Sequence, residues 1–376
     1  MTLATLHVQR VQRWQRWALE DWGAIWAKIV NPPQSVESPF PNQRVVVRWW
    51  TDDIDSDYIA RGYTGGVAFV RRMLPVWRDR PYATAYELAN EPDVNDPWWR
   101  RQVVAYSRGA MDEANQHGIK LVILLPPEAS PHGGDPYSPE LRIAKCRELV
   151  PAVKQAVEQG HYVGMHAYWR PGVAGPTDSF HALGHVALTA SVWGDAGVDL
   201  DRLQLLVTET GIDGGIAGHT PRQGWRDFMD IGAYAQQIAE AEMYARALGY
   251  VKALMLFTAG YQSPWGRFDL VEADCRVIGR SLRSLPPPVS PGPVVDDSWI
   301  AETRQHRLRL NPDAALKQAI EAAGQCCASN EFDATGHAES ATAFQYGFAN
   351  NTWYLWKWSR AEGVKVIYTE KAERGS

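Results

Sequence analysis

Two glutamates each stand at the end of an apolar run that is typical of a buried strand. Glu91 comes directly after Asn90 and the run 83–89, and Glu209 ends the run 203–209. Strands buried on both faces form short continuous apolar runs, and in a parallel barrel their carboxyl ends meet at one face. Two carboxyl groups that flank one bond can donate a proton and attack or activate water, which is the chemistry of glycosidic bond cleavage.

Further polar and aromatic side chains fall at the ends of other predicted strands. His166 and Tyr168 are two residues apart, so they share one face of the run 161–168. Arg48 and Trp50 lie at the end of the run 44–50, and Trp169 follows Tyr168. Phe257 lies in the run 251–258, and Trp265 lies in the loop after it. Flat aromatic faces suit sugar rings. The sequence therefore predicts that substrate is bound by Asn90, His166, Tyr168, Arg48, Trp50, Trp169, Phe257 and Trp265.

Eight apolar runs alternate with longer amphipathic segments, which is the pattern of βα units around a parallel sheet. The predicted strands are 3–9, 24–30, 44–50, 83–89, 119–125, 161–168, 203–209 and 251–258. The predicted helices are 13–22, 58–77, 98–117, 139–159, 180–196, 233–248 and 275–285. The crossover 34–42 is short and contains two prolines, and it is assigned only a helix-like segment. The pattern predicts an α/β fold, a (β/α)8 TIM barrel.

A proline-rich segment, 286–293, separates two regions of different composition. We expect a catalytic barrel over 1–285 and a small C-terminal accessory segment over 294–376, of α+β or β-rich structure. In that segment a helix is predicted at 311–323, and strands at 344–346, 352–358 and 364–369, with a turn at 350–351. The segment is either a wall-binding module or a structural cap, and its Trp-rich cluster favours a core over a sugar platform.

Three motifs carry a family resemblance. Residues 87–92, Glu-Leu-Ala-Asn-Glu-Pro, resemble the strand-four Asn-Glu-Pro signature of the large clan of retaining TIM-barrel glycoside hydrolases. That clan includes cellulases, mannanases, β-xylosidases and β-galactosidases. Residues 206–211, Leu-Val-Thr-Glu-Thr-Gly, resemble its strand-seven nucleophile motif, and 164–168, Gly-Met-His-Ala-Tyr, are similar to its strand-six His-x-Tyr element. The resemblance spans residues 1–285 and implies hydrolysis of β-linked glycans with retention of configuration.

The resemblance also implies roles for individual residues. Glu91 would be the general acid/base and Glu209 the nucleophile. Asn90 would donate a hydrogen bond to the sugar 2-hydroxyl, Tyr168 would hold Glu209, and His166 would line the same subsite. The clan presents a Trp on strand eight, whereas Phe257 occupies that strand here and Trp265 follows in the loop.

The two glutamates need different protonation states. Glu209 must be ionised to attack, so a cation such as Arg48 and a hydroxyl such as that of Tyr168 are expected to hold its pKa down. Glu91 must begin protonated in order to donate to the leaving group. Glu87 is predicted to be structural, as part of an ion pair in the barrel wall.

Composition argues against several other classes of protein. A formal net charge of -5 provides no basic field for nucleic acid, and no apolar stretch is long enough to cross a membrane. The four cysteines form neither a metal-binding pattern nor a disulfide framework. The sequence predicts no cofactor and no catalytic metal, an oligo- or polysaccharide substrate, and a monomer.

Localisation and two alternative functions stay open. The N-terminal residues show no signal peptide, which favours the cytoplasm, although an extracellular or phage-associated protein remains an alternative. One alternative is a carbohydrate-binding barrel without catalytic activity, against which the intact glutamate pair argues. The other is a phage-type cell-wall lysin with the C-terminal segment as its wall-binding module.

Overall fold

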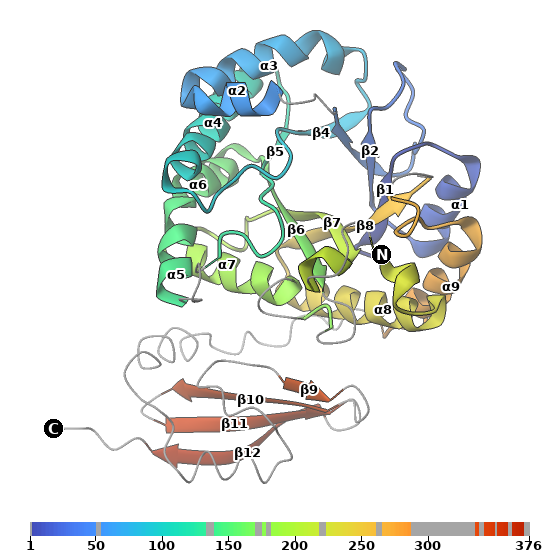
Figure 1. The fold of residues 1–376 in the computed structure, drawn as a ribbon, viewed down its shortest axis with the longest axis vertical. Helices are drawn as coiled ribbons and strands as arrows, with labels where there is room; N and C mark the ends of the chain where they lie inside the picture. Colours follow the sequence, from blue (N-terminus) through green and yellow to red (C-terminus); the bar gives the residue numbers. More distant parts are fainter. Residues whose placement is uncertain are drawn as a thin grey trace, which may run out of the picture. The chain divides into compact units, whose positions relative to one another are not determined.

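A computed structural model describes the chain over residues 2–49, 54–132, 139–169, 175–177, 182–217, 223–260 and 265–286. It also describes the backbone of residues 335–337, 342–349, 352–359 and 363–371. The chain divides into two compact units, Met1–Pro288 and Val289–Ser376, and this boundary falls inside the proline-rich segment 286–293. Figure 1 shows both units, and each is described here by itself.

The first unit is a closed barrel of eight parallel strands surrounded by helices (Figure 1). The strands are β1 (Ala4–Val8), β2 (Trp26–Val30), β3 (Arg44–Arg48), β4 (Ala83–Glu87), β5 (Leu121–Leu124), β6 (Tyr162–Trp169), β7 (Leu205–Ile212) and β8 (Val251–Ala259). Strand β1 pairs in parallel with both β2 and β8, which closes the barrel. The predicted (β/α)8 TIM barrel is therefore confirmed.

Nine α-helices lie in the described part of this unit. They are α1 (Arg13–Trp22), α2 (Ile54–Ala60), α3 (Gly62–Arg78), α4 (Pro97–Gln116), α5 (Pro139–Glu148), α6 (Val150–Gln159), α7 (Leu183–Asp195), α8 (Ile231–Leu248) and α9 (Glu272–Arg283). Two short 3-10 turns, Gly214–Ala217 and Trp225–Asp227, follow β7. No helix of the described residues is long and apolar enough to cross a membrane.

The structure corrects three predictions about helices. No helix joins β2 to β3, because residues 31–43 form turns and bends around several prolines, which lack the N–H that a helix interior requires. The predicted helix 58–77 is two helices, separated at Arg61, and the second begins at Gly62, whose φ of 54° is left-handed. The predicted helix 139–159 is also two, and Pro151 occupies the first turn of α6, where a missing N–H is tolerated.

The barrel interior has two layers of side chains. The lower layer is apolar and includes Trp26, Val46, Ala85, Val122, Leu206 and Met255. Two residues further along β2, β3 and β4, the same inward face carries charge, since side chains alternate along a strand. The upper layer consists of buried His7, Lys28, Arg48, Glu87, His166 and Glu209. The carboxyl end of the barrel, where active sites of this fold lie, is thus its polar end.

The second unit contains a four-stranded antiparallel sheet in the order β12-β11-β10-β9 (Figure 1). Its strands are β9 (Thr335–His337), β10 (Thr342–Ala349), β11 (Thr352–Ser359) and β12 (Gly363–Lys371). The strands predicted at 344–346, 352–358 and 364–369 are confirmed, and the pairing of β10 with β11 continues to Ala349 and Thr352. The predicted helix 311–323, the turn 350–351 and most of the segment 286–293 lie outside the described residues.

Candidate active site

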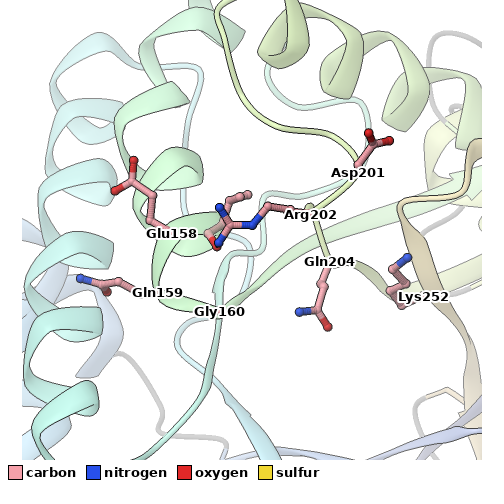
Figure 2. A pocket seen from close by; sticks show the side chains of 8 residues that line it. Glu158, Gln159, Gly160, Asp201, Arg202, Gln204 and Lys252 are labelled. Atoms are coloured by element: carbon pink, nitrogen blue, oxygen red, sulfur yellow. The ribbon is translucent and has the colours of Figure 1, made fainter.

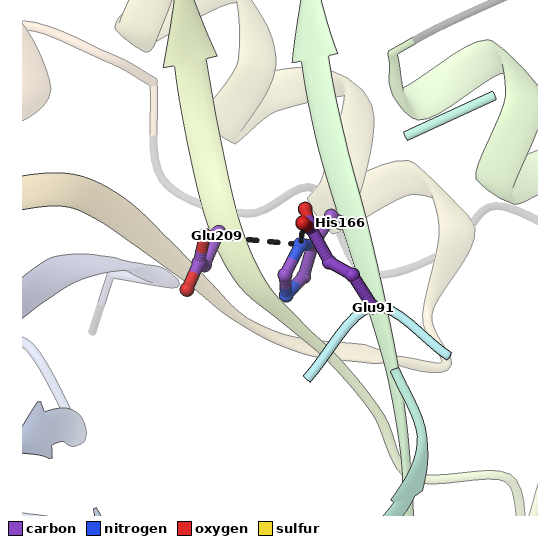
Figure 3. Close-up of side chains that lie close together, drawn as sticks. All are labelled: Glu91, His166 and Glu209. Atoms are coloured by element: carbon purple, nitrogen blue, oxygen red, sulfur yellow. Dashed lines mark hydrogen bonds and ion pairs between the residues drawn. The ribbon is translucent and has the colours of Figure 1, made fainter. Parts of the chain in front are cut away.

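Glu91 and Glu209 meet at the carboxyl end of the barrel, on either side of His166 (Figure 3). Glu209 lies within β7, and Glu91 lies in the loop after β4. One ligand atom from each of the three residues lies within 4.8 Å of the others, so the two carboxylates approach each other to that distance or closer. The sequence placed the pair at strands four and seven, and the fold brings the side chains together.

Glu209 is held at both carboxylate oxygens. Its Oε1 accepts hydrogen bonds from Lys28 Nζ at 3.2 Å and from Arg48 Nη1 at 3.1 Å. Its Oε2 accepts one from the Tyr168 hydroxyl at 2.9 Å. The residue is 7% exposed, and its orientation is fixed by groups from β2, β3 and β6. A carboxylate held in this way is preorganised to attack from one oxygen.

The electrostatic surroundings keep Glu209 ionised. Burial raises the pKa of Glu209, but the charges of His166, Lys28, His7 and Arg48, in decreasing order, outweigh burial and hold that pKa well below its usual range. Burial also raises the pKa of Tyr168 well above its usual value, so its hydroxyl stays protonated and donates. The site therefore favours a carboxylate at Glu209 and a neutral donor beside it.

Glu91 has a different setting. Its backbone φ is 46°, in the left-handed region that non-glycine residues seldom occupy, and its N–H donates to Leu125 O at 3.1 Å. Strained backbone of this kind is often found at functional sites. The Glu91 side chain is 39% exposed, whereas that of Glu209 is 9% exposed. Glu91 can therefore exchange protons with solvent while Glu209 is shielded.

His166 links the two carboxylates. Its Nδ1 lies 2.9 Å from Glu91 Oε1 and 3.7 Å from Glu209 Oε2. Burial lowers the pKa of His166, but the negative charge of Glu209 and the hydrogen bond with Glu91 more than offset this and raise the pKa overall. Its Nε2 is buried and has no hydrogen-bond partner among the described residues. His166 thus positions Glu91 through one nitrogen and stabilises negative charge at both carboxylates.

Phe257 and Trp265 lie beside this centre, as the sequence predicted. The Phe257 ring packs edge-on against Tyr168, with ring centroids 6.1 Å apart, and against Trp265 at 5.7 Å. Asn90 precedes Glu91, and its side-chain oxygen is buried without a hydrogen-bond partner in the described part of the chain. An unsatisfied amide oxygen at this position is suited to a ligand hydroxyl.

Trp169 is not part of the site, which corrects the prediction. Its side chain is fully buried, it donates to Gln237 Oε1 of α8 at 2.7 Å, and its ring lies against Tyr234. The cause is that β6 continues through Trp169, so alternation turns Trp169 toward the helices when Tyr168 faces the interior. Trp50, which was predicted to bind substrate, lies outside the described residues.

Sequence reasoning missed Lys28 and His7. Lys28 is fully buried, and His7 Nδ1 lies 3.6 Å from Glu209 Oε1. The available signal was a charged or titratable residue inside an apolar strand run, Trp-Ala-Lys-Ile-Val for β2 and Ala-Thr-Leu-His-Val for β1. Buried charges are rare unless they are paired, so each such residue implied a partner on another strand. The predicted ion pair of Glu87 is confirmed, because Lys28 Nζ lies 3.0 Å from Glu87 Oε1.

Two further carboxyl groups lie near Glu91. Glu128 follows β5, and burial together with the negative charge of Glu91 raises the pKa of Glu128 to about 7. Asp213 follows β7, and burial raises its pKa as well. The mouth of the barrel is therefore acidic above the buried cations.

A metal ion is poorly suited to this centre. Among the described residues, Glu91, His166 and Glu209 are the set that comes close enough together to hold one. Lys28 and Arg48 already supply positive charge within 3.2 Å of Glu209, and they would repel a cation at the same oxygens.

A separate hollow of about 510 Å³ lies at the opposite end of the barrel (Figure 2). It is lined in part by Glu158, Arg202, Gln204 and Lys252, near the amino ends of β6, β7 and β8. It contains no part of the carboxylate pair, and residues at this end of the fold contribute to stability.

No protein-family model matches the chain, and no curated protein matches it. Among solved structures, it is similar to a GH128 endo-β-1,3-glucanase from Amycolatopsis mediterranei in complex with laminaritriose, with 15% identity and a TM-score of 0.45 over 75% of this chain and 100% of the other. It is similar to a GH30 endoxylanase from Clostridium papyrosolvens, with 10% identity and a TM-score of 0.44 over 95% and 81% of the two chains. It is also similar to a GH2 β-galacturonidase from Eisenbergiella tayi, with 12% identity and a TM-score of 0.45 over 77% and 52%. These structural similarities establish neither the family nor the substrate of this protein, so its function is inferred from the residues of the site.

Proposed function

We propose that this protein is a glycoside hydrolase that cleaves β-linked glycans with retention of configuration. The observation that carries the proposal is the approach of the Glu91 and Glu209 carboxylates to within 4.8 Å. Retaining enzymes hold their two carboxyl groups about 5 to 5.5 Å apart, whereas inverting enzymes separate them by about 6.5 to 9.5 Å to admit a water molecule. A nearest approach of 4.8 Å or less supports the shorter, retaining spacing.

In the first step Glu209 attacks the anomeric carbon and forms a glycosyl ester. Oε2 is the attacking oxygen, because Oε1 is already occupied by two cations. Glu91 gives its proton to the oxygen of the leaving group as the glycosidic bond breaks. Tyr168 stays hydrogen-bonded to Oε2 and orients it toward the substrate.

In the second step Glu91, now ionised, accepts a proton from water. The water oxygen attacks the anomeric carbon from the face that the leaving group vacated, and Glu209 departs as a carboxylate. Two displacements at one carbon restore the original configuration. The greater exposure of Glu91 is what this exchange of a proton and a water molecule requires.

The substrate is an oligo- or polysaccharide bound across the barrel mouth. Asn90 is assigned to the sugar 2-hydroxyl, and its unpaired buried oxygen supports a polar ligand at that position. Phe257 and Trp265 are assigned to an aromatic wall against which a sugar ring packs.

The test is a panel of 2,4-dinitrophenyl β-glycosides (glucoside, xyloside, mannoside and cellobioside) together with the matching polysaccharides. NMR of the first product formed on the hydrolysed substrate should show the β anomer, with Glu209→Ala as the inactive control. A first product of α configuration would contradict Glu209 as nucleophile. Glycan binding without hydrolysis of any panel member would instead support a carbohydrate-binding barrel that lacks activity.

A further inference from the structure

Four buried charges form a closed ring that includes the proposed nucleophile, Glu209. Lys28 Nζ lies 3.0 Å from Glu87 Oε1 and 3.2 Å from Glu209 Oε1. Arg48 Nη1 lies 3.1 Å from the same Glu209 oxygen, and Arg48 Nε lies 4.0 Å from Glu87 Oε2. The charges alternate in sign around the ring, and two cations balance two anions.

Lys28 is the member of the ring that is completely enclosed. Its side chain is 0% exposed, and its third contact is the backbone carbonyl of Thr208, at 3.2 Å. Arg48, by contrast, is 7% exposed. A lysine held between two carboxylates in a dry interior interacts strongly with any change in their charge, because solvent screens it little.

The charge balance changes when substrate reacts. In the free enzyme Lys28 and Arg48 face Glu87 and Glu209, and these four charges sum to zero. His166, 3.7 Å from Glu209 Oε2, lies outside the ring and is the same in wild type and in every ring variant, so it does not alter the comparison between them. In the glycosyl-enzyme Glu209 is an uncharged ester, so the ring carries one excess positive charge. That excess disappears when the ester is cleaved and the Glu209 carboxylate returns.

We propose that Lys28 is a positioning residue that destabilises the glycosyl-enzyme and thereby makes Glu209 a good leaving group in the second half-reaction. The proposal rests on the proposed function, since it assigns a role within that mechanism. Glu87 is the fixed counter-charge that keeps the ring neutral before substrate reacts.

The affected step is the cleavage of the bond between the anomeric carbon and Glu209 Oε2. Water supplies the oxygen that forms the new bond to carbon, and Glu91 takes the proton from water. The electron pair of the broken bond returns to Glu209, whose negative charge is stabilised by Lys28. No oxidant, reductant or further reactant takes part.

Lys28→Met reverses which of the two states, free enzyme or glycosyl-enzyme, has the neutral ring. The free variant has one excess negative charge in the ring, and its glycosyl-enzyme is neutral, so the intermediate is favoured. We expect the enzyme trapped with the matching 2-deoxy-2-fluoro-β-glycoside to reactivate about tenfold more slowly or worse, since an opposite charge within about 4 Å moves a carboxyl pKa by about 1 to 3 units. The rate of trapping should fall much less, and kcat and KM should fall together.

The double variant Lys28→Met/Glu87→Gln separates this role from a merely structural one. Its free ring contains Arg48 and Glu209 only and is neutral, and its glycosyl-enzyme again has one excess positive charge. Reactivation should therefore return most of the way to the wild-type rate, although a second ring residue has been changed. Lys252→Met is the matched control, because Lys252 lies at the amino end of β8, far from the ring, and its reactivation rate should equal that of wild type.

The outcomes are distinct. Equal losses of trapping and reactivation in Lys28→Met, or no recovery in the double variant, would overturn the role of Lys28 while leaving the proposed function in place. Should Lys28→Met not fold, Lys28→Gln keeps similar length and hydrogen bonding without the charge, and the same slow reactivation is expected. A wild-type protein that no fluoroglycoside traps and that hydrolyses no panel member would overturn the proposed function, and the role of Lys28 with it.

Discussion

The lower and upper layers of the barrel interior are built from the same strands with the same inward and outward alternation, but the lower layer is apolar and the upper layer is charged. On β2, β3 and β4, the inward residues Trp26, Val46 and Ala85 are apolar and packed. Two positions later the strands carry Lys28, Arg48 and Glu87, all buried and all charged. A well-packed apolar layer stabilises the fold directly, whereas a buried ion pair is at best weak evidence of stability, because desolvation opposes the attraction between its charges.

The difference indicates where function resides. Within the upper layer, side-chain atoms such as His7 Nδ1 and His166 Nε2 are buried without a hydrogen-bond partner among the described residues. Unsatisfied buried polar atoms are few in native proteins and call for an explanation. These atoms therefore support the proposed substrate site, and the apolar layer beneath them needs no ligand.

The largest expected effect comes from changing Glu209 of the upper layer or its partner Glu91, in the loop after β4. Glu209→Ala removes the proposed nucleophile and should reduce turnover by about 10⁴-fold or more on natural and activated substrates alike. Glu91→Ala removes the proposed proton donor and should reduce turnover on natural glycans by about 10² to 10⁴-fold. On a 2,4-dinitrophenyl glycoside, Glu91→Ala should show a burst, because that leaving group needs no proton while the second step has lost its base.

Azide distinguishes the two roles. In Glu91→Ala, azide enters the space of the missing side chain, needs no general base, and should yield a β-glycosyl azide with recovery of turnover. In Glu209→Ala, azide attacks the opposite face and should yield the α-glycosyl azide. NMR of the glycosyl azides identifies the anomer that each variant forms. If Glu91→Ala gave the α-azide and Glu209→Ala the β-azide, the roles of the two glutamates would be the reverse of those proposed.

A change in the lower layer should have the opposite character. Met255 is fully buried in that layer, and Met255→Ala should lower the free energy of unfolding by about 2 to 5 kcal/mol, through lost burial and the cavity that remains. The value of kcat per folded molecule, measured well below the unfolding temperature, should stay within about twofold of wild type, because Met255 packs in the apolar cluster and forms no part of the upper layer. Urea unfolding and active-site titration measure the two quantities. A large loss of kcat in a fully folded Met255→Ala would remove the distinction between the layers.

Sequence alone predicted the barrel because its signal is repeated. Each strand is an apolar run followed by an amphipathic helix, and glycines such as Gly23 and Gly160, with φ of 67° and 68°, end helices where the pattern stops. That alternation fails at the crossover between β2 and β3, where residues 31–43 contain no helix. The prolines of this segment argue against a helix, whereas the repeated βα pattern of the rest of the barrel argues for one.

The site was predictable only as far as strand ends and motifs allowed. Glu91, Glu209, His166 and Tyr168 fall at or near the ends of the predicted strands, and the order of strands brings them together, although β7 continues three residues beyond Glu209 to Ile212. The sequence does not fix the end of β6 to within one residue. That residue decides the position of Trp169, because neighbouring residues of a strand point to opposite faces, and Trp169 therefore faces the helices. Lys28 pairs with groups on β4 and β7, and such long-range pairing depends on barrel closure rather than on local pattern.

The smallest expected effect concerns a half-buried carboxyl group at the rim, Glu128, which sharpens the contrast with Glu209. Cations surround Glu209 and lower its pKa, whereas burial and the neighbouring charge of Glu91 raise the pKa of Glu128 to about 7. Between about pH 4.5 and pH 7 the unfolded chain has lost the Glu128 proton while the folded chain keeps it, so the folded state binds more protons and stability falls as pH rises. Glu128→Gln removes that dependence and should raise the free energy of unfolding by about 1 to 3 kcal/mol at pH 8, with little change at pH 4. Urea unfolding of both proteins across pH 4 to 8 provides the measurement, and Glu158→Gln, at the far end of the barrel, serves as the matched control. Parallel pH curves for wild type and Glu128→Gln would mean that Glu128 ionises as freely in the fold as in the unfolded chain, and that the rim resembles solvent rather than the upper layer.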